Sequence, residues 1–226
     1  NVIDPILLMD QYGADSLRMT LCSMAAQGRD IKLSTQRVEG YRNFITKIWN
    51  AIKFFEMNEC HYSNFNVEEC NNDFNIWILK QLDQCENETK NALESYRFNE
   101  AANSLYRFIW NIFCDWYIEL SKTILSDTDH EDRVETQNVA SYVLKNIMIM
   151  LHPIMPFVTE HLWAQIDFIN QNNSNKVIHA NWPQIVKSKK DEDGNINKLI
   201  EIISSIRSTR SELNVPLKAM IEIIYD

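Results

Sequence analysis

The sequence predicts an all-α protein: an antiparallel helical bundle with a small C-terminal appendage made of a helix and a short strand. Three observations lead to this class. The chain has 226 residues, which is enough for one large domain with an appendage. It contains four glycines and five prolines, too few for the frequent turns of a β-sandwich. Apolar side chains also recur at the three- and four-residue spacing of amphipathic helices.

The first 33 residues are expected to form two short connector helices. Asp4 and Pro5 are typical of a helix start, because an aspartate caps the first turn and a proline fits the first helical position. Gly13 is expected to end this helix, and a second helix follows over residues 14–24. Residues 1–33 would therefore lead into the main bundle.

The next helix, expected over residues 34–57 with Ser34 as its cap, is amphipathic. Its apolar face consists of Tyr41, Phe44, Ile45, Ile48, Ile52 and Phe55. The opposite stripe consists of Gln36, Gly40, Asn43, Lys47, Asn50 and Phe54. Phe54 is thus an aromatic side chain on an otherwise polar stripe, which is the one irregularity of the pattern.

Four more helices complete the predicted bundle, which extends over residues 34–166. We expect them at residues 73–96, 99–125, 135–151 and 157–166. The second of these is apolar nearly all round, which is typical of a helix in the centre of a bundle. Pro153 and Pro156 interrupt the chain between the last two, because proline cannot continue a helix.

Residues 167–226 are expected to form the appendage. An Asn-rich loop leads to a helix over residues 196–213, which Pro216 ends, and residues 219–225 have the composition of a strand. That strand has no evident partner in the sequence, and the chain does not begin with methionine. We therefore expect a fragment of a longer protein, cut short at its C-terminal end.

The chain is acidic as a whole, but its charge is unevenly distributed. The formal net charge is −9, which on its own argues against a nucleic-acid partner. Residues 29–53, however, contain six basic and two acidic side chains, a net charge of +4, so the remaining residues carry −13. A basic segment on an acidic body can still bind a polyanion locally.

No pattern of catalytic or metal-ligating residues is found in the sequence. Glycine-rich phosphate loops, a G-x-S-x-G element and an H-E-x-x-H element are all missing. The five cysteines and five histidines are scattered without zinc-ligand spacing, so we expect reduced thiols and structural histidines. Asp115, beside Trp116 and Tyr117, is expected to be hydrogen-bonded within the bundle core. No catalytic site and no metal site is therefore predicted.

No membrane association is predicted either. No apolar run approaches the roughly 18 residues that suggest a membrane span. The start of the chain also lacks the basic and apolar regions of a secretory leader. Together with the unpaired cysteine pattern, this favours a cytoplasmic protein.

The remaining candidate site is the polar stripe of residues 34–57, for which the pattern allows two interpretations. Its candidate contacts are Asn43, Lys47 and Asn50 on one face, Arg42 and Lys53 on the flank, and Phe54 at the end. Cations, amides and an aromatic ring in this arrangement are typical of sites that bind unpaired RNA. The alternative is a solvated helix face on which Phe54 packs against a neighbouring helix, and the pattern alone favours this alternative.

Two stretches near the N-terminus resemble class I aminoacyl-tRNA synthetases. Asn1-Val2-Ile3-Asp4-Pro5 resembles the end of the signature loop that closes their active site, without the lysines and serines of that loop. The second stretch resembles the helix that follows this loop in these enzymes; it is Tyr12-Gly13-Ala14-Asp15-Ser16-Leu17-Arg18. These stretches identify the class and leave the amino acid open.

Further stretches resemble the valyl-tRNA synthetases specifically. They are Gly28-Arg29-Asp30-Ile31, Glu39-Gly40-Tyr41-Arg42-Asn43-Phe44, Lys47-Ile48-Trp49-Asn50-Ala51, Tyr96-Arg97-Phe98-Asn99-Glu100-Ala101-Ala102 and Phe113-Cys114-Asp115-Trp116-Tyr117. Residues 151–163 resemble a segment that valine, isoleucine and leucine enzymes share. The resemblance extends from Asn1 to about Val215, and one departure is Thr46, where the family usually has asparagine.

This resemblance implies a domain that binds the anticodon stem-loop of a valine-accepting tRNA. Position by position, the resemblance implies that the RNA is contacted by Gln36, Arg37, Asn43, Lys47, Asn50 and Phe54. It also implies that Arg42 and Lys53 contact phosphates on the flank. It further implies a monomeric parent enzyme whose upstream catalytic domain joins valine to tRNA with ATP and Mg²⁺. No cofactor is therefore expected in this chain itself.

Three alternatives stay open. The chain could belong to an isoleucyl- or leucyl-tRNA synthetase, although the Gly-Arg-Asp-Ile and Asp-Trp-Tyr stretches argue against that. It could be a helical scaffold whose bundle binds protein and not RNA. A metal- or thiol-dependent enzyme is the third alternative, and it would require stoichiometric metal in the purified protein.

Overall fold

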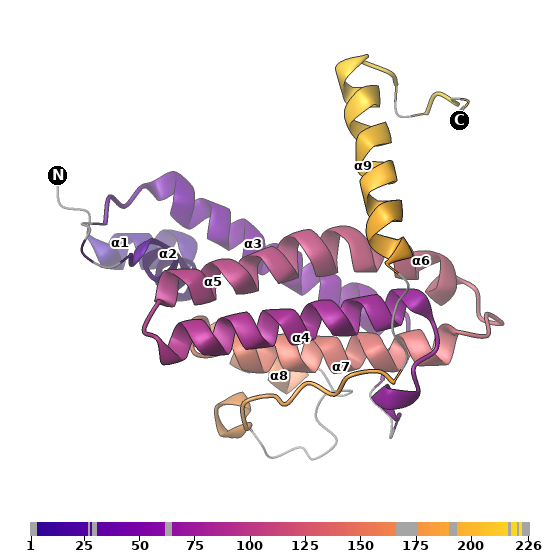
Figure 1. The fold of residues 1–226 in the computed structure, drawn as a ribbon. Helices are drawn as coiled ribbons and strands as arrows, with labels where there is room; N and C mark the ends of the chain where they lie inside the picture. Colours follow the sequence, from indigo (N-terminus) through magenta and orange to yellow (C-terminus); the bar gives the residue numbers. More distant parts are fainter. Residues whose placement is uncertain are drawn as a thin grey trace. The chain divides into compact units, whose positions relative to one another are not determined.

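The computed structural model describes residues 4–26, 28, 31–61, 65–165, 176–189, 194–216, 218–220 and 222. Within these residues every regular element is a helix, which confirms the predicted all-α class. The bundle consists of α3 (Thr35–Met57), α4 (Asp73–Glu94), α5 (Phe98–Tyr106), η2 (Arg107–Tyr117), α6 (Ile118–Ser126) and α7 (Arg133–Leu151). Figure 1 shows α4 lying between α7 and the long helix formed by α5, η2 and α6.

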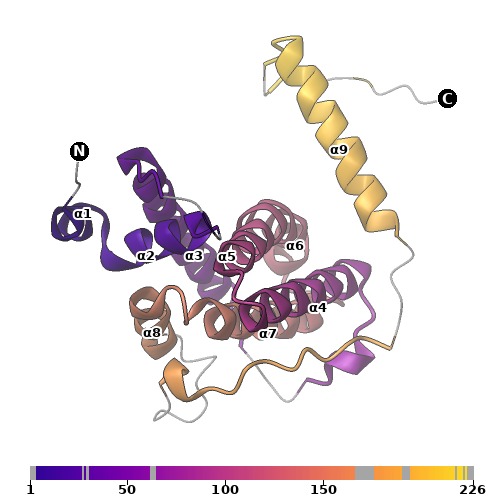
Figure 2. The same ribbon diagram turned by 60° about the vertical axis from the view of Figure 1, so that its left-hand side comes forward.

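Within the described residues, the bundle has four long helices if α5, η2 and α6 are counted as one. Consecutive long helices run antiparallel, whereas two pairs of neighbours that are not consecutive run parallel. Tyr41 of α3 contacts Tyr106, and Phe55, farther along α3, contacts Phe113 of η2, so these two helices point the same way. The starts of α4 and α7 are joined by a hydrogen bond, and both helices then run in the same direction in Figure 1. In Figure 2 the four helices surround a common core, which is built from apolar side chains of each.

The central helix is continuous from Phe98 to Ser126, close to the predicted range of residues 99–125. Its middle section, η2, nevertheless winds as a π-helix. In π winding each N–H bonds to the carbonyl five residues back, so the turn is wider than in an α-helix. The spacing of apolar residues does not reveal this change. A helix that is apolar nearly all round has no clear period, so its pattern fits either winding.

The connector helix α2 (Ala14–Met24), which follows α1 (Pro5–Tyr12), is held to α8 (Pro156–Gln165) and to the segment that leads into it. The buried carboxylate of Asp15 accepts hydrogen bonds from two backbone N–H groups in the first turn of α8 and so caps that helix. The guanidinium of Arg18 donates to two carbonyls of the preceding proline-broken turn. Burial raises the pKa of Asp15, and the two backbone hydrogen bonds partly offset that effect.

A polar network joins the start of α4, the end of η2 and the start of α7. The Tyr117 hydroxyl donates to Oδ1 of Asn75 at 2.7 Å, and Nδ2 of Asn75 donates to Glu135 at 3.0 Å and to Thr136 at 3.1 Å. The Glu135 carboxylate also accepts two backbone N–H groups and a thiol from residues 70–72. Burial alone would raise the pKa of Glu135, but these hydrogen bonds outweigh it and lower the pKa.

Residues 176–189 run along the bundle as a strap, which includes the short helix η3 (Val177–His179). The indole N–H of Trp182 donates to Glu86 of α4, and the backbone N–H of Val186 donates to the Tyr142 hydroxyl of α7. The contacts of the chain divide it into two units between residues 191 and 192. The strap therefore packs with the bundle, whereas the appendage was expected to begin at residue 167.

The second unit contains α9 (Asn195–Glu212), close to the helix predicted over residues 196–213. The strand predicted over residues 219–225 is not found at the described positions 219, 220 and 222, and its other positions lie outside the described residues. Among the helices of the described ranges, none combines the length and the apolar character needed to cross a membrane.

The Glu135→Gln substitution tests the network. It keeps the shape of the side chain but replaces a charged acceptor of four hydrogen bonds, so we expect the free energy of unfolding to fall by about 1–3 kcal/mol. Because folding lowers the pKa of Glu135, its stabilisation is complete above the ordinary glutamate pKa of about 4.3. It is lost as the pH falls through the folded-state pKa.

Urea unfolding followed by circular dichroism at several pH values between about 3 and 7 measures both effects. Glu131→Gln, at an exposed position in the loop before α7, is the matched control and should leave the unfolding curve unchanged. Equal unfolding curves for Glu135→Gln and the unsubstituted chain at neutral pH would contradict the role given to this carboxylate.

Candidate nucleic-acid interface

The outward face of α3 carries most of the side chains predicted to contact RNA. A capped first turn leaves Gln36 and Arg37 exposed, and Arg42, Asn43 and Asn50 are exposed farther along the same helix. The side chains buried on the opposite face are Val38, Phe44, Ile48, Ala51, Ile52 and Phe55. The helix is therefore amphipathic as expected, with amides and cations directed to solvent.

Lys47, between Asn43 and Asn50, is held by η2. Its Nζ lies 2.5 Å from Oδ1 of Asp115 and 3.8 Å from the centre of the Trp110 ring. Its side chain is 25% exposed, whereas that of Asp115 is 45% exposed. The ammonium is thus oriented by an ion pair on one side and by a cation–π contact on the other.

The π winding of η2 explains how Trp110 and Asp115 meet the same ammonium. In an α-helix, side chains five residues apart point about 140° away from each other, since each residue turns the helix by about 100°. In a π-helix the fifth residue returns close to the same side. The expectation that Asp115 is hydrogen-bonded within the core is therefore wrong: its carboxylate lies at the surface and binds Lys47.

Aromatic side chains fill the seam between α3 and the helix formed by α5 and η2. The rings of Tyr106 and Trp110 are stacked, with centroids 5.7 Å apart and planes at 12°. Tyr41 meets Tyr106 edge-on, and Phe44 packs beneath both rings of the pair at 5.0 and 6.3 Å. Burial raises the pKa of Tyr106, helped by Tyr41 and Asp115. Tyr41, Tyr106 and Trp110 are partly exposed, so the seam adds aromatic surface to the α3 face.

The end of the α3 stripe is less open than the pattern predicts. The Phe54 ring is only partly exposed and packs edge-on against Phe55, with centroids 5.1 Å apart. Lys53 is paired with Glu56 at 2.7 Å and lies 5.9 Å from the Trp49 ring. The structure therefore groups Asn43, Lys47 and Asn50 with η2, while Lys53 and Phe54 have partners within α3 itself.

The thiols do not form a reactive centre. Burial raises the pKa of Cys60, Cys85 and Cys114 to about 12, so these groups are protonated and weakly nucleophilic at neutral pH. In the described part of the chain, no cluster of histidine, cysteine or acidic side chains could hold a metal ion. The face of α3, with the adjoining seam, carries amides, a fixed ammonium and aromatic rings, groups that can form hydrogen bonds and stack.

The chain is similar to several valine–tRNA ligases. It is 46% identical over 225 residues to the ligase of Mesorhizobium japonicum and 47% identical over 225 residues to that of Rhizobium meliloti. It is 48% identical over 217 residues to the ligase of Agrobacterium fabrum. These alignments cover 99%, 99% and 96% of this chain, but only 24%, 24% and 23% of the ligases. The chain thus spans about a quarter of the length of these curated relatives.

A solved structure and a family model agree with this similarity. The LeuRS–tRNA–LeuAMS ternary complex of Agrobacterium radiobacter K84 matches with a TM-score of 0.61 over 93% of this chain and 27% of that chain. At 16% sequence identity this likeness shows the fold alone. The family model of the anticodon-binding domain of tRNA ligase matches residues 75–225, about two thirds of the chain. The chain therefore belongs to the family of anticodon-binding domains of tRNA ligases.

Proposed function

We propose that the chain is the anticodon-binding domain of a valine–tRNA ligase and that it holds the anticodon stem-loop of a valine-accepting tRNA on the outward face of α3. The observation that carries this proposal is the row of Asn43, Lys47 and Asn50, two exposed amides on either side of an oriented ammonium. Identities of 46–48% to valine–tRNA ligases support valine over leucine or isoleucine.

Recognition on this face divides into phosphate and base contacts. The exposed guanidinium groups of Arg37 and Arg42 suit phosphates, which position the RNA and carry no sequence information. The amides of Asn43 and Asn50 present both donors and acceptors and suit base edges. Phe54, whose ring is partly exposed, stacks on an unpaired base at the end of the row.

Lys47 has a different role from the arginines, because its charge is matched by Asp115. An ammonium has three N–H donors, of which one meets the carboxylate. The remaining N–H groups are held in a fixed orientation and donate hydrogen bonds to the RNA. The Asp115 carboxylate accepts a hydrogen bond from an exocyclic amino group of a base. The pair is neutral as a whole, so it contributes to base discrimination more than to charge neutralisation.

The parent enzyme supplies the chemistry in this proposal. Its upstream catalytic domain, outside this chain, joins valine to the tRNA with ATP and Mg²⁺ in the cytoplasm. The enzyme acts as a monomer, and this domain holds the tRNA at the anticodon end. A helical scaffold that binds only protein is the competing function, and RNA binding that ignores the anticodon sequence would favour it.

Fluorescence anisotropy with a labelled valine anticodon stem-loop tests the proposal. We expect binding that weakens as salt rises, because phosphate contacts release counterions. Changing the middle or third anticodon base should weaken it further, by about 1–3 kcal/mol for each lost base contact. Asn43→Ala and Asn50→Ala should reduce the difference between matched and changed loops, and Phe54→Ala should weaken both. Equal binding of all loops, or none, would contradict the proposed function.

The Asp115→Asn substitution tests the neutral pair. It removes the charge that matches Lys47, so the freed ammonium should bind a phosphate instead of a base edge. We expect the slope of log K against log salt to steepen by about 0.7, the value for one single-strand phosphate, while discrimination between anticodon bases falls.

Glu119→Gln is the matched control, since it breaks the exposed Glu119–Lys122 pair on α6 at the same N–O distance of 2.5 Å. It should change neither quantity. An unchanged salt slope and unchanged discrimination for Asp115→Asn would show that the pair has only a structural role.

A further inference from the structure

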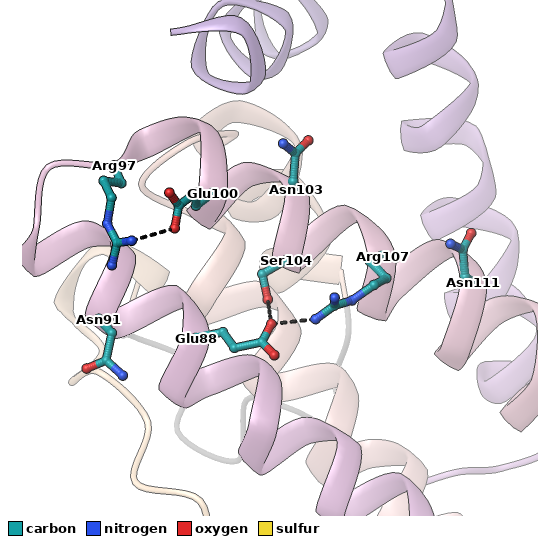
Figure 3. Close-up of a pocket in the computed structure, with 8 residues that line it drawn as sticks. All are labelled: Glu88, Asn91, Arg97, Glu100, Asn103, Ser104, Arg107 and Asn111. Carbon is teal, nitrogen blue, oxygen red and sulfur yellow. Dashed lines mark hydrogen bonds and ion pairs between the residues drawn. The ribbon is translucent and has the colours of Figure 1, made fainter. Parts of the chain in front are cut away.

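A polar pocket of about 700 Å³ is lined by residues of α4, of the turn that follows it, and of the helix formed by α5 and η2. Figure 3 shows the two arginines of its wall, Arg97 and Arg107, with carboxylates beside them. Three amides, those of Asn91, Asn103 and Asn111, complete the wall. The volume falls within the range of about 300–1,000 Å³ that is usual for small-ligand sites.

The charged groups of the pocket are arranged in two pairs. Oε2 of Glu88 accepts hydrogen bonds from the Ser104 hydroxyl at 2.8 Å and from Nη2 of Arg107 at 2.5 Å. Nη1 of Arg97 lies 2.9 Å from Oε2 of Glu100. Each guanidinium has five N–H donors in a planar fork, so each pair leaves donors that fit the oxygens of a phosphate. Because both cations are paired with anions, the pocket would hold a phosphodiester through the unused N–H donors of the two guanidinium groups and not through net positive charge.

Burial alone would raise the pKa of Glu88, but hydrogen bonds from Gln84 and Ser104 and the guanidinium of Arg107 outweigh it and lower the pKa. Glu88 therefore stays ionised at neutral pH and keeps Arg107 in place. The Asn103, Arg107 and Asn111 side chains, four residues apart from one to the next, repeat the order of amide, cation and amide found on α3.

A second observation is the backbone of Tyr96, in the turn between α4 and α5. α4 ends at Glu94 and not at residue 96 as predicted, because Tyr96 adopts the left-handed conformation with φ 57°. Its N–H bonds to the carbonyl of Leu93, and the next N–H bonds to that of Ala92, the closing pattern in which the left-handed residue is usually glycine. A tyrosine here is strained, and such strain is found preferentially at functional sites.

The strained turn presents an aromatic surface directly beside the pocket. Tyr96 is 74% exposed and Phe98 is 43% exposed, and their rings meet edge-on with centroids 6.4 Å apart. Arg97, which lines the pocket, lies between them in the chain. Two exposed rings next to a guanidinium are the groups that hold an unstacked base and its phosphate.

We infer that this pocket and the Tyr96 turn form a second RNA subsite, which binds one unpaired nucleotide with its phosphodiester at Arg97 and Arg107 and its base on the Tyr96 ring. The inference rests on the proposed function, because the same tRNA would have to reach both the outward face of α3 and this pocket. In this subsite the amides of the wall donate to the ribose hydroxyl or accept from it, and the carboxylates accept from it; this hydroxyl distinguishes RNA from DNA.

The Tyr96→Gly substitution provides the sharpest test, because it should raise the stability of the fold while it lowers the affinity for RNA. Glycine adopts φ 57° without strain, so we expect the thermal midpoint to rise by about 2–4 °C. Loss of one base stack should weaken binding of a full-length valine-accepting tRNA transcript by about 5- to 140-fold, measured by fluorescence anisotropy. Phe157→Ala, which removes another exposed ring, is the control and should leave the affinity unchanged.

Arg107→Gln tests the phosphate contact in the same assay. Loss of the charged N–H donors should weaken binding of the transcript by about 10- to 140-fold, whereas Lys122→Gln should leave the affinity unchanged. If the unsubstituted chain binds the tRNA but Tyr96→Gly and Arg107→Gln bind it equally well, the second subsite is refuted while the anticodon function stands. If the unsubstituted chain binds neither the stem-loop nor the transcript, both proposals fail.

Discussion

The amide of Asn75 is the interaction on which the rest of the structure depends. It is fully buried where α4, η2 and α7 meet, and it bonds to Tyr117, Glu135 and Thr136 at the same time. A buried polar group that loses its partner costs about 1–3 kcal/mol, so none of the three helices can slide or rotate without loss. Because Tyr117 is the last residue of η2, the network also sets how the π section is turned toward α3, and with it the place where Asp115 meets Lys47.

Much of the fold could be predicted because local chemistry marks helix ends and periodicity marks their faces. Asp4 and Ser34 were recognisable as caps, and both accept the expected backbone N–H groups. The end of α4 was misplaced by two residues, because a tyrosine in a left-handed conformation has no sequence signal of the kind that glycine provides. The π winding of η2 was missed for a related reason, since an all-round apolar helix does not reveal its period.

The site was predictable only where it depends on a single helix. Asn43, Lys47 and Asn50 follow from the turn of α3 alone, and the structure does place them on one face. The partners of Lys47 come from another helix, 63 and 68 positions farther along the chain, with a winding that an α-helical pattern misplaces. The pairing of Glu88 with Arg107 likewise requires the packing of α4 against η2. Such contacts between helices have no counterpart in local spacing.

The parallel course of α3 and the helix formed by α5 and η2 has an electrostatic consequence. Each helix carries roughly half a positive charge at its N-terminus and half a negative charge at its C-terminus. These partial charges cancel between antiparallel neighbours but add between parallel ones. The face shared by the two helices is therefore polarised along its length, with Arg37 near its positive end. An anionic group is therefore favoured at the N-terminal end of this face and a cationic group at its C-terminal end, so the two ends differ in the partners they favour.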